Sequence, residues 1–202
     1  MDFVKEDLTK DIYKKLGPFD HYEHVEEEID EVDRTTRLDF DVRKSGALFR
    51  GQSSLSTARP DGFGFKVYPN GSIFEGSFVE GQVNGWGRGI THRGEVYQGP
   101  FVYDCMDGEG LFQWPDGRVF WGNFQMGKKN GKGTYMWPNG QAYEGDFKND
   151  ECAGVGTLHY PDGKRYEGPW KDGKKHGKGV YIWPNGAKYN CYYNDGRKQE
   201  DG

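Results

Sequence analysis

Residues 143–163 read YEGDFKNDECAGVGTLHYPDG, and this stretch contains one clear copy of the pattern from which the fold is predicted. Large and polar residues alternate over residues 143–148, which is typical of a strand with one buried face. Residues 149–150 start a turn, and residues 154–160 form the return strand of a predicted β-hairpin. Pro161-Asp162-Gly163 then predicts a tight turn of type II, in which proline presets φ and glycine accepts a positive φ.

The same unit recurs along most of the chain. An aromatic-x-Gly triplet opens each copy; the first two triplets are 25 residues apart and all later neighbours are 23 apart. From the second copy onward, a Gly-x-Gly follows nine residues after the triplet glycine, and a further glycine closes the unit. The triplets begin at Phe49, Phe74, Tyr97, Phe120, Tyr143, Tyr166 and, in a degenerate copy, Tyr189. Glycines kept in register over so many units predict a repeat protein.

Each unit is predicted to place rings and glycines on one face and polar groups on the other, because side chains alternate across a strand. In the unit quoted above, Tyr143, Gly145 and Phe147 share the first face, while Glu144 and Asp146 share the second. Aromatic residues make up 16% of the chain and Gly occurs 32 times, whereas all hydrophobic types together reach only 34%. We therefore expect a core of rings lying on glycine backbone, which has no Cβ to block them.

Hairpins of this kind are marginally stable alone and need neighbours to bury their faces. We therefore predict an all-β fold, an elongated single-layer antiparallel sheet of stacked hairpins. It covers residues 46–194, with six full repeats and a half-repeat cap, and a charged tail of residues 195–202 follows. The last half-hairpin leaves a strand edge that is either capped by residues 195–198 or paired with a second chain, which would give a homodimer.

Residues 1–45 lack the repeat and form an acidic N-terminal segment with a net charge of −6. A helix over about residues 3–16 is predicted, followed by an extended segment, because Gly17-Pro18 ends the helical pattern. The segment is either a solvated, partly disordered leader or a docking segment that binds its own sheet or a partner. An apolar stripe with a spacing of four residues favours docking. The stripe consists of Val4, Leu8, Ile12 and Leu16.

Composition argues against several classes of function. The net charge is −5 overall and +4 over residues 118–202, which is too little for a nucleic-acid-binding surface. Three cysteines fit no metal spacing and suit a reducing compartment, and neither a membrane span nor a signal peptide is recognisable, so we expect a cytoplasmic protein. His21 and His24 could hold a metal with Glu27 or Glu28, but a solvated charged face is the stronger interpretation. Without an acid/base or nucleophile constellation, we expect neither enzymatic activity nor a cofactor.

Two sets of residues are candidates for partner binding. Rings at the end of the second strand of a unit are expected to be partly exposed and to line a groove for a partner peptide, unless they belong to the core of the fold. They are Trp114, Trp137, Tyr160 and Trp183. Lysines in the same hairpin loop of two units could bind an acidic protein tail or, weakly, an anionic lipid, unless they simply suit exposed turns. They are Lys128, Lys129, Lys132, Lys174, Lys175 and Lys178.

The pattern Tyr-x-Gly-x-Phe/Trp, followed by Gly-x-Gly-x-x-x-x-Pro-(Asn/Asp)-Gly, resembles the MORN (membrane occupation and recognition nexus) repeat over about residues 47–193. The resemblance implies a twisted sheet of hairpins and a non-enzymatic scaffold, as in radial spoke heads of cilia, cortical cytoskeletons of parasites and junctophilins. We therefore expect a scaffold or adaptor that organises a cytoskeletal assembly, with the ciliary axoneme as the specific case.

The alternative is a peripheral membrane adaptor that binds anionic lipid through the lysine-rich loops. The sequence departs from the family pattern at Gly89-Ile90-Thr91, where rings are missing, and at Cys191, where a glycine is lost. We expect the unit that contains the first departure to be thin or kinked, and the copy that contains the second to be a cap.

Overall fold

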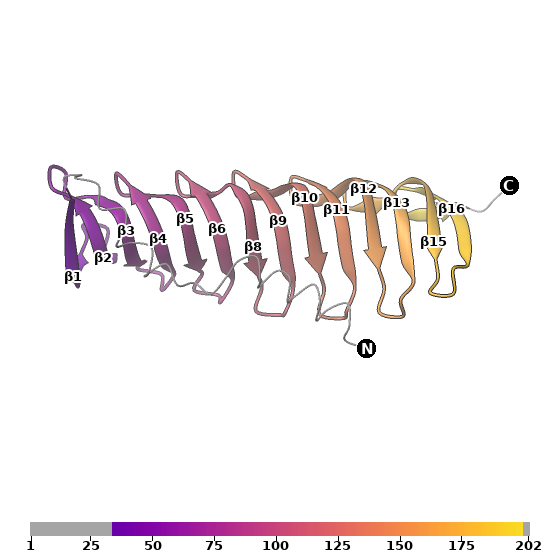
Figure 1. The fold of residues 1–202 in the computed structure, drawn as a ribbon, viewed down its shortest axis with the longest axis horizontal. Coiled ribbons are helices and arrows are strands. Elements are labelled where there is room, and N and C mark those ends of the chain that lie inside the picture. Colours follow the sequence, from indigo (N-terminus) through magenta and orange to yellow (C-terminus); the bar gives the residue numbers. More distant parts are fainter. Residues whose placement is uncertain (1–33, 200–202) are drawn as a thin grey trace. The chain divides into compact units, whose positions relative to one another are not determined.

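The computed structural model describes the backbone of residues 34–199 and the side chains of residues 43–199. The described chain consists of strands and turns that follow one another as antiparallel hairpins (Figure 1). The predicted all-β fold of single-layer antiparallel hairpins is confirmed. The predicted N-terminal helix and its stripe of Val4, Leu8, Ile12 and Leu16 lie outside the described residues.

The described chain divides into two compact units, and the first contains residues 34–94 and 101–104. Its strands pair in chain order, each antiparallel to the next. Strand β1 lies within the predicted N-terminal segment, so the sheet starts before residue 46. The strands are β1 (Arg34–Val42), β2 (Leu48–Ser54), β3 (Pro60–Val67), β4 (Ile73–Val79) and β5 (Gln82–Ile90).

The second unit contains residues 95–100 and 105–199, and its strands are again antiparallel in chain order. The last two residues of its first strand, β6, belong to the first unit. The strands are β6 (Val96–Val102), β7 (Cys105–Met106), β8 (Gly108–Gln113), β9 (Val119–Gln125), β10 (Lys128–Met136), β11 (Ala142–Lys148), β12 (Glu151–His159), β13 (Arg165–Lys171), β14 (Lys174–Lys175), β15 (Gly177–Ile182), β16 (Lys188–Asn194) and β17 (Arg197–Gln199).

Strand β17 comes from the predicted charged tail and pairs with the second half of β16. The pairing joins Tyr192 to Gln199 and Asn194 to Arg197. Part of the tail therefore belongs to the sheet and covers part of the last strand edge. This is the capping arrangement that the sequence left open beside pairing with a second chain.

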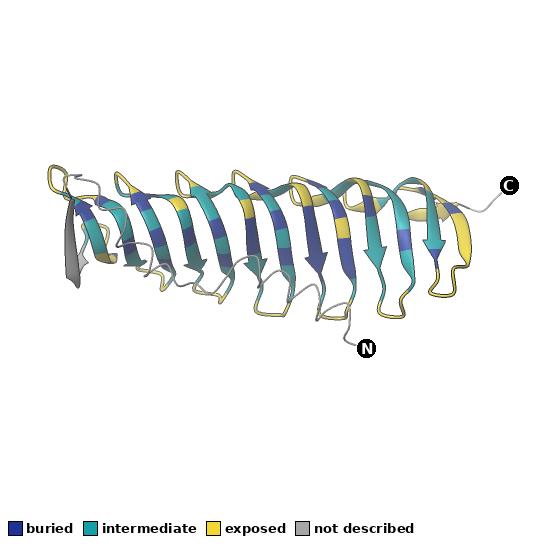
Figure 2. Cartoon of the chain, in the orientation of Figure 1, coloured by how far each residue is buried: buried dark blue, intermediate teal, exposed yellow. Residues whose placement is uncertain are grey.

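The core of each unit consists of triplet rings that lie on glycine backbone, as the sequence predicts. In the fourth repeat, Gly122 and Gly133 face each other across β9 and β10, and the Phe120 ring covers both. A Cβ added to Gly133 would lie 2.5 Å from the Phe120 ring, closer than real Cβ contacts. Tyr143 and Tyr166 occupy the same place in the next two repeats and are 0% exposed. Figure 2 shows buried residues along the strands of both units and exposed residues at the turns.

The Pro-(Asn/Asp)-Gly turns differ from the predicted type II. In the turn between β10 and β11, the Gly140 N–H donates to the Trp137 carbonyl, so Pro138 and Asn139 are the central residues. A type II turn needs a positive φ at the second central residue, but here only the glycine after it has one, at 85°. Asn139 instead accepts a hydrogen bond from the Gln141 N–H at 3.0 Å. The turn is therefore an Asx-supported tight turn closed by a left-handed glycine.

From the second repeat onward, the turns at the other end of the hairpins have two residues, both with positive φ. Asn149 and Asp150, between β11 and β12, have φ of 49° and 76°, which is the signature of a type I′ turn. The Asp150 N–H donates to the Lys129 carbonyl of the preceding repeat at 3.0 Å. One repeat later, the Gly173 N–H donates to the Cys152 carbonyl in the same way. These turns therefore connect successive repeats as well as the two strands of one hairpin.

Candidate partner-binding face

The face that carries the triplet rings is called the aromatic face below. In the second unit its core rings, buried apart from the half-buried Trp170, meet edge to face along the repeats. Their centroids are 5.0 Å apart for Phe120 and Phe147 and for Tyr143 and Trp170. Interplanar angles of 75° and 78° at these contacts fit the preferred T-shaped geometry. This ring row is the structural core, and a partner cannot reach it without opening the fold.

A second, more open row of rings lies at the end of the return strands and contains the predicted groove residues. Trp114, Trp137 and Tyr160 are half-buried, and Trp183 is 38% exposed. The pairs in contact are Phe112–Trp114, Trp114–Tyr135, Tyr135–Trp137, Tyr160–Tyr181 and Tyr181–Trp183, with centroids 4.5–6.3 Å apart. Leu158 stands at the ring position between Trp137 and Tyr160, where the row of rings is interrupted.

Lys175 points its ammonium group into the aromatic face, where four rings surround it. Its Nζ donates to the hydroxyl oxygens of Tyr160 and Tyr181, both at 2.8 Å. Ring centroids lie 4.4–5.5 Å away, within the range of cation–π attraction. The four rings are Tyr160, Tyr166, Tyr181 and Tyr193.

Lys129 occupies the same place two repeats earlier. Its Nζ lies 4.9–5.9 Å from four ring centroids, and its backbone N–H donates to Asp150 Oδ1 at 3.0 Å. Burial lowers the pKa of Lys129, and the negative charge of Asp150 partly opposes this. The rings are those of Trp114, Phe120, Tyr135 and Phe147.

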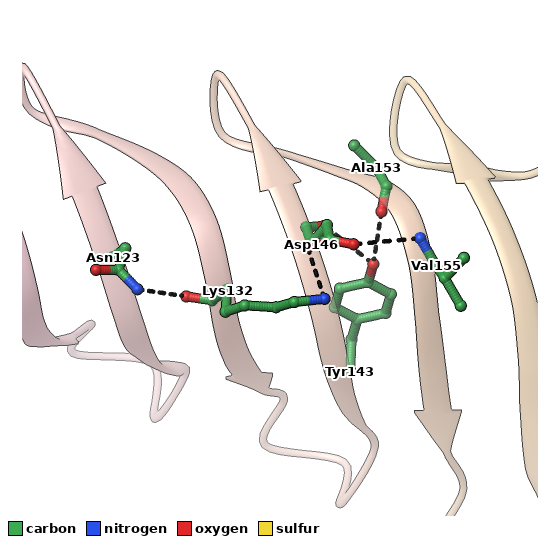
Figure 3. Close-up of polar contacts among 6 residues, drawn as sticks. All are labelled: Asn123, Lys132, Tyr143, Asp146, Ala153 and Val155. Carbon is green, nitrogen blue, oxygen red and sulfur yellow. Dashed lines mark hydrogen bonds and ion pairs between the residues drawn. The ribbon is translucent and has the colours of Figure 1, made fainter.

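The other four candidate lysines, Lys128, Lys132, Lys174 and Lys178, are exposed. Lys132 lies on the face opposite the rings and forms an ion pair of 2.7 Å with Asp146 (Figure 3). Asp146 also accepts a hydrogen bond from the Val155 N–H at 3.4 Å. The six lysines therefore do not share one surface, which the loop positions in the sequence could not reveal.

Among the described side chains, residues 43–199, no group of three His, Cys, Asp or Glu could hold a metal ion. Cys105 is exposed, Cys152 is half-buried and Cys191 is buried, and none of the three forms a disulfide among the described residues. No helix in the described part of the chain is long and apolar enough to cross a membrane.

Fold and face together define a β-hairpin repeat protein with a core of rings on glycine. A family model described as the MORN repeat matches residues 59–73, 97–117, 122–142, 143–165 and 166–188, just over half of the chain. The chain therefore belongs to the MORN repeat family. The matches leave out residues 74–96, the repeat in which Gly89 and Thr91 stand where other repeats carry rings on the return strand, and the degenerate copy at Tyr189.

Several solved structures show partial similarity, and no curated protein matches. The TCP domain of SAS-4 (dCPAP) from Drosophila melanogaster, in complex with a proline-rich motif of Ana2 (dSTIL), is 16% identical with a TM-score of 0.49. The alignment covers 81% of this chain and 90% of that one. The TCP10 domain of Danio rerio CPAP is 13% identical with a TM-score of 0.38, over 79% of this chain and 71% of that one.

Proposed function

We propose that this protein is a non-enzymatic scaffold or adaptor that holds other proteins of a larger assembly through its aromatic face. The observation that carries the proposal is the partly exposed row formed by Trp114, Trp137, Tyr160 and Trp183. Trp and Tyr are enriched among the residues that dominate binding energy at interfaces. The backbone that carries these rings is fixed by the packing of the buried triplet rings on glycine. We therefore expect little conformational entropy to be lost when a partner binds.

A double substitution tests the proposal. Trp137→Ala with Trp183→Ala removes two rings of the open row, and we expect the tagged protein to lose partners that the unmodified chain retains in affinity purification with mass spectrometry. Tyr192→Ala is the matched control, because Tyr192 is 43% exposed and pairs with Lys178 on the opposite face. A double variant that remains folded and keeps every partner contradicts the proposal.

We further propose that the assembly is cytoskeletal and the protein cytoplasmic, with a radial spoke of the ciliary axoneme as the specific case. Membership of the MORN family supports this, because the resemblance to scaffolds of cilia and cell cortex extends over the repeats. Localisation of the tagged protein in detergent-extracted cells tests it. Complete loss of the protein with the soluble fraction contradicts a cytoskeletal role.

The second candidate function is a peripheral membrane adaptor. It is favoured by the exposed Lys128, Lys132, Lys174 and Lys178, but Lys129 and Lys175 direct their charge at rings. At about 1 kcal/mol per lysine near an anionic bilayer, the exposed set gives weak attachment. Sedimentation with phosphatidylserine liposomes separates the two candidates, since lipid binding through these lysines should appear at low salt and vanish at high salt.

A further inference from the structure

Lys175 and three tyrosines bring their polar groups together on the aromatic face. The Lys175 ammonium group donates to the hydroxyl oxygens of Tyr160 and Tyr181, both at 2.8 Å. The hydroxyls of Tyr181 and Tyr193 lie 3.0 Å apart and share one hydrogen bond. Lys175, Tyr160 and Tyr181 are half-buried, whereas Tyr193 is only 9% exposed. These four residues are called the lysine–tyrosine cluster below.

The cluster contains more hydrogen-bond donors than it can satisfy by itself. The ammonium group supplies three donor hydrogens and the three hydroxyls supply one each, so six converge here. Two go from Lys175 to hydroxyls and one joins Tyr181 with Tyr193. A contact between the Tyr160 and Tyr181 hydroxyls uses at most a fourth, which leaves at least two donors without an acceptor inside the cluster. Burial raises the pKa of Tyr181, and its hydrogen bonds raise it further, so this hydroxyl stays a donor at pH 7.

The corresponding lysine two repeats earlier has a carboxylate beside it. Burial lowers the pKa of Lys129, and the negative charge of Asp150 opposes this. The Asp150 N–H donates to the Lys129 carbonyl, and the Gly196 N–H makes the same backbone contact with the Lys175 carbonyl at 2.9 Å. Glycine therefore stands beside Lys175 at the place where aspartate stands beside Lys129.

Other acidic side chains near the cluster in the sequence have their own cations. Asp195 lies 3.2 Å from His176 Nδ1, and Asp162 lies 3.7 Å from Lys164 Nζ. In the part of the chain that the structure describes, no carboxylate lies within ion-pair distance of Lys175. The cluster therefore has a positive charge and spare donors, and it lacks a group that only accepts hydrogen bonds.

We propose that the lysine–tyrosine cluster binds the carboxylate of an acidic side chain, Glu or Asp, of a partner polypeptide. The inference rests on the proposed function of the aromatic face as a protein-binding surface. Tyr160, Tyr181 and Trp183 belong to the open ring row, with neighbouring centroids 6.2–6.3 Å apart, so a polypeptide on that row lies next to the cluster. A carboxylate carries the opposite charge and accepts hydrogen bonds through two oxygens, which matches the spare donors.

Peptide titration tests the chemistry of the cluster directly. The probes are a capped Gly-Gly-Glu-Gly-Gly peptide and its glutamine counterpart, which has a similar shape without the charge. The NMR signals of the Tyr160 and Tyr181 rings report occupancy. We expect the glutamate peptide to bind roughly tenfold more tightly, because hydrogen bonds to a charged acceptor are stronger than those to a neutral one. Equal affinities, or signals that neither peptide shifts, overturn the proposal.

Substitutions in the cluster provide the second test. Lys175→Met keeps an unbranched side chain over the rings and removes the charge, so we expect glutamate-peptide binding to weaken by about tenfold or more. Tyr160→Phe keeps the ring and removes one donor, and should weaken binding roughly threefold. Lys171→Met is the matched control, because Lys171 is exposed and loses the same charge from the same hairpin outside the cluster. Undiminished binding by either cluster variant contradicts the proposal.

The two proposals fail in distinguishable ways. If the glutamate peptide does not bind and Lys175→Met keeps every cellular partner, while Trp137→Ala with Trp183→Ala loses them, the carboxylate site is wrong and the protein-binding face stands. If the glutamate peptide binds as expected but the double variant keeps every partner, the carboxylate site stands and the open ring row is not the binding surface.

Discussion

The contact between a triplet ring and glycine is the smallest unit of this fold. Phe120 is 0% exposed and lies against both Gly122 and Gly133. The degenerate copy shows the opposite case. Cys191 stands where the triplet glycine belongs, and Tyr189 is 41% exposed. The buried triplet ring thus lies on bare glycine backbone, and the exposed Tyr189 belongs to the copy that has lost the triplet glycine.

The first prediction tests this contact. Gly133→Ala should destabilise the protein by about 1–3 kcal/mol, because its Cβ would meet the buried Phe120 ring and the ring has no room to move. Gly89→Ala is the matched control in a strand, since its Cβ would meet Phe101 at an ordinary 3.9 Å. Urea unfolding of both variants measures the difference, and equal stability would contradict the ring-on-glycine account.

The second prediction concerns two buried tyrosine hydroxyls. The Tyr143 hydroxyl lies 3.0 Å from the Asp146 carbonyl oxygen (Figure 3), whereas the Tyr166 hydroxyl has no hydrogen-bond partner among the described residues. Tyr143→Phe should cost about 1 kcal/mol, and Tyr166→Phe should be neutral or stabilising, because an unsatisfied buried hydroxyl is itself unfavourable. Thermal unfolding at pH 7 compares them, and equal losses of stability would be the contrary result.

Tyr166 also makes the stability of the protein depend on pH in the alkaline range. Burial raises the pKa of Tyr166 to about 12, from an ordinary value of 10.0. Between these values the unfolded chain releases the proton and the folded chain keeps it, so the stability contribution present below pH 10 is lost as the pH rises. Between pH 9 and pH 12, the free energy of unfolding should fall less steeply with pH for Tyr166→Phe than for the unmodified chain. An unchanged slope would contradict the assignment.

At the scale of the element, the two-residue turns hold each hairpin to its neighbour. Asp150 has a positive φ of 76°, and its carboxylate accepts the Lys129 N–H at 3.0 Å. Most other turns of this kind have glycine at the same place, which carries no penalty for a positive φ. At Asp150 the hydrogen bond to the preceding repeat offsets the backbone strain.

The third prediction separates these two effects. Asp150→Ala keeps the strained φ and loses the hydrogen bond, so it should destabilise the protein by about 1–3 kcal/mol. Asp150→Gly loses the same bond but relieves the strain, and we expect roughly 1 kcal/mol less destabilisation. Denaturant midpoints of the two variants give the comparison. A glycine variant as unstable as the alanine variant would show that strain is not the difference.

At the scale of the whole molecule, the sheet ends at β16 and β17. Strand β17 covers β16 only over residues 192–194, and within the described chain no other strand pairs with this side of residues 188–190. An uncovered strand edge is a template for pairing with a second chain. We therefore propose that the C-terminal half-repeat is the place where a homodimer would form.

The fourth prediction follows from that edge. Deletion of residues 195–202 removes β17 and lengthens the free edge of β16, so self-association should increase. Light scattering after size-exclusion chromatography, over a range of concentrations, measures it. Lys188→Ala is the control, because it changes the same strand without removing its cover. A truncated chain that remains as monomeric as the full chain argues against dimerisation through this strand.

The sequence alone was sufficient to predict the hairpins, the positions of their turns and the rings that lie on glycine. These features depend on local alternation and on glycine spacing, which repeat within 23 residues. It was not sufficient to predict the type of the Pro-(Asn/Asp)-Gly turns. The Pro-(Asn/Asp)-Gly motif suits several turns, and the backbone conformation of Asn139, whose side chain accepts the Gln141 N–H, distinguishes the one found here.

The direction of the lysine side chains and the pairing of β1 with the sheet could be learned only from the folded structure. Lys175 lies among rings from three successive repeats, including Tyr193, which follows 27 residues after the triplet ring Tyr166. A lysine has a long stem with many rotamers, and its spacing in the sequence does not say which of them is used. The stacking of repeats brings these rings together, and their combined attraction selects the direction of the side chain.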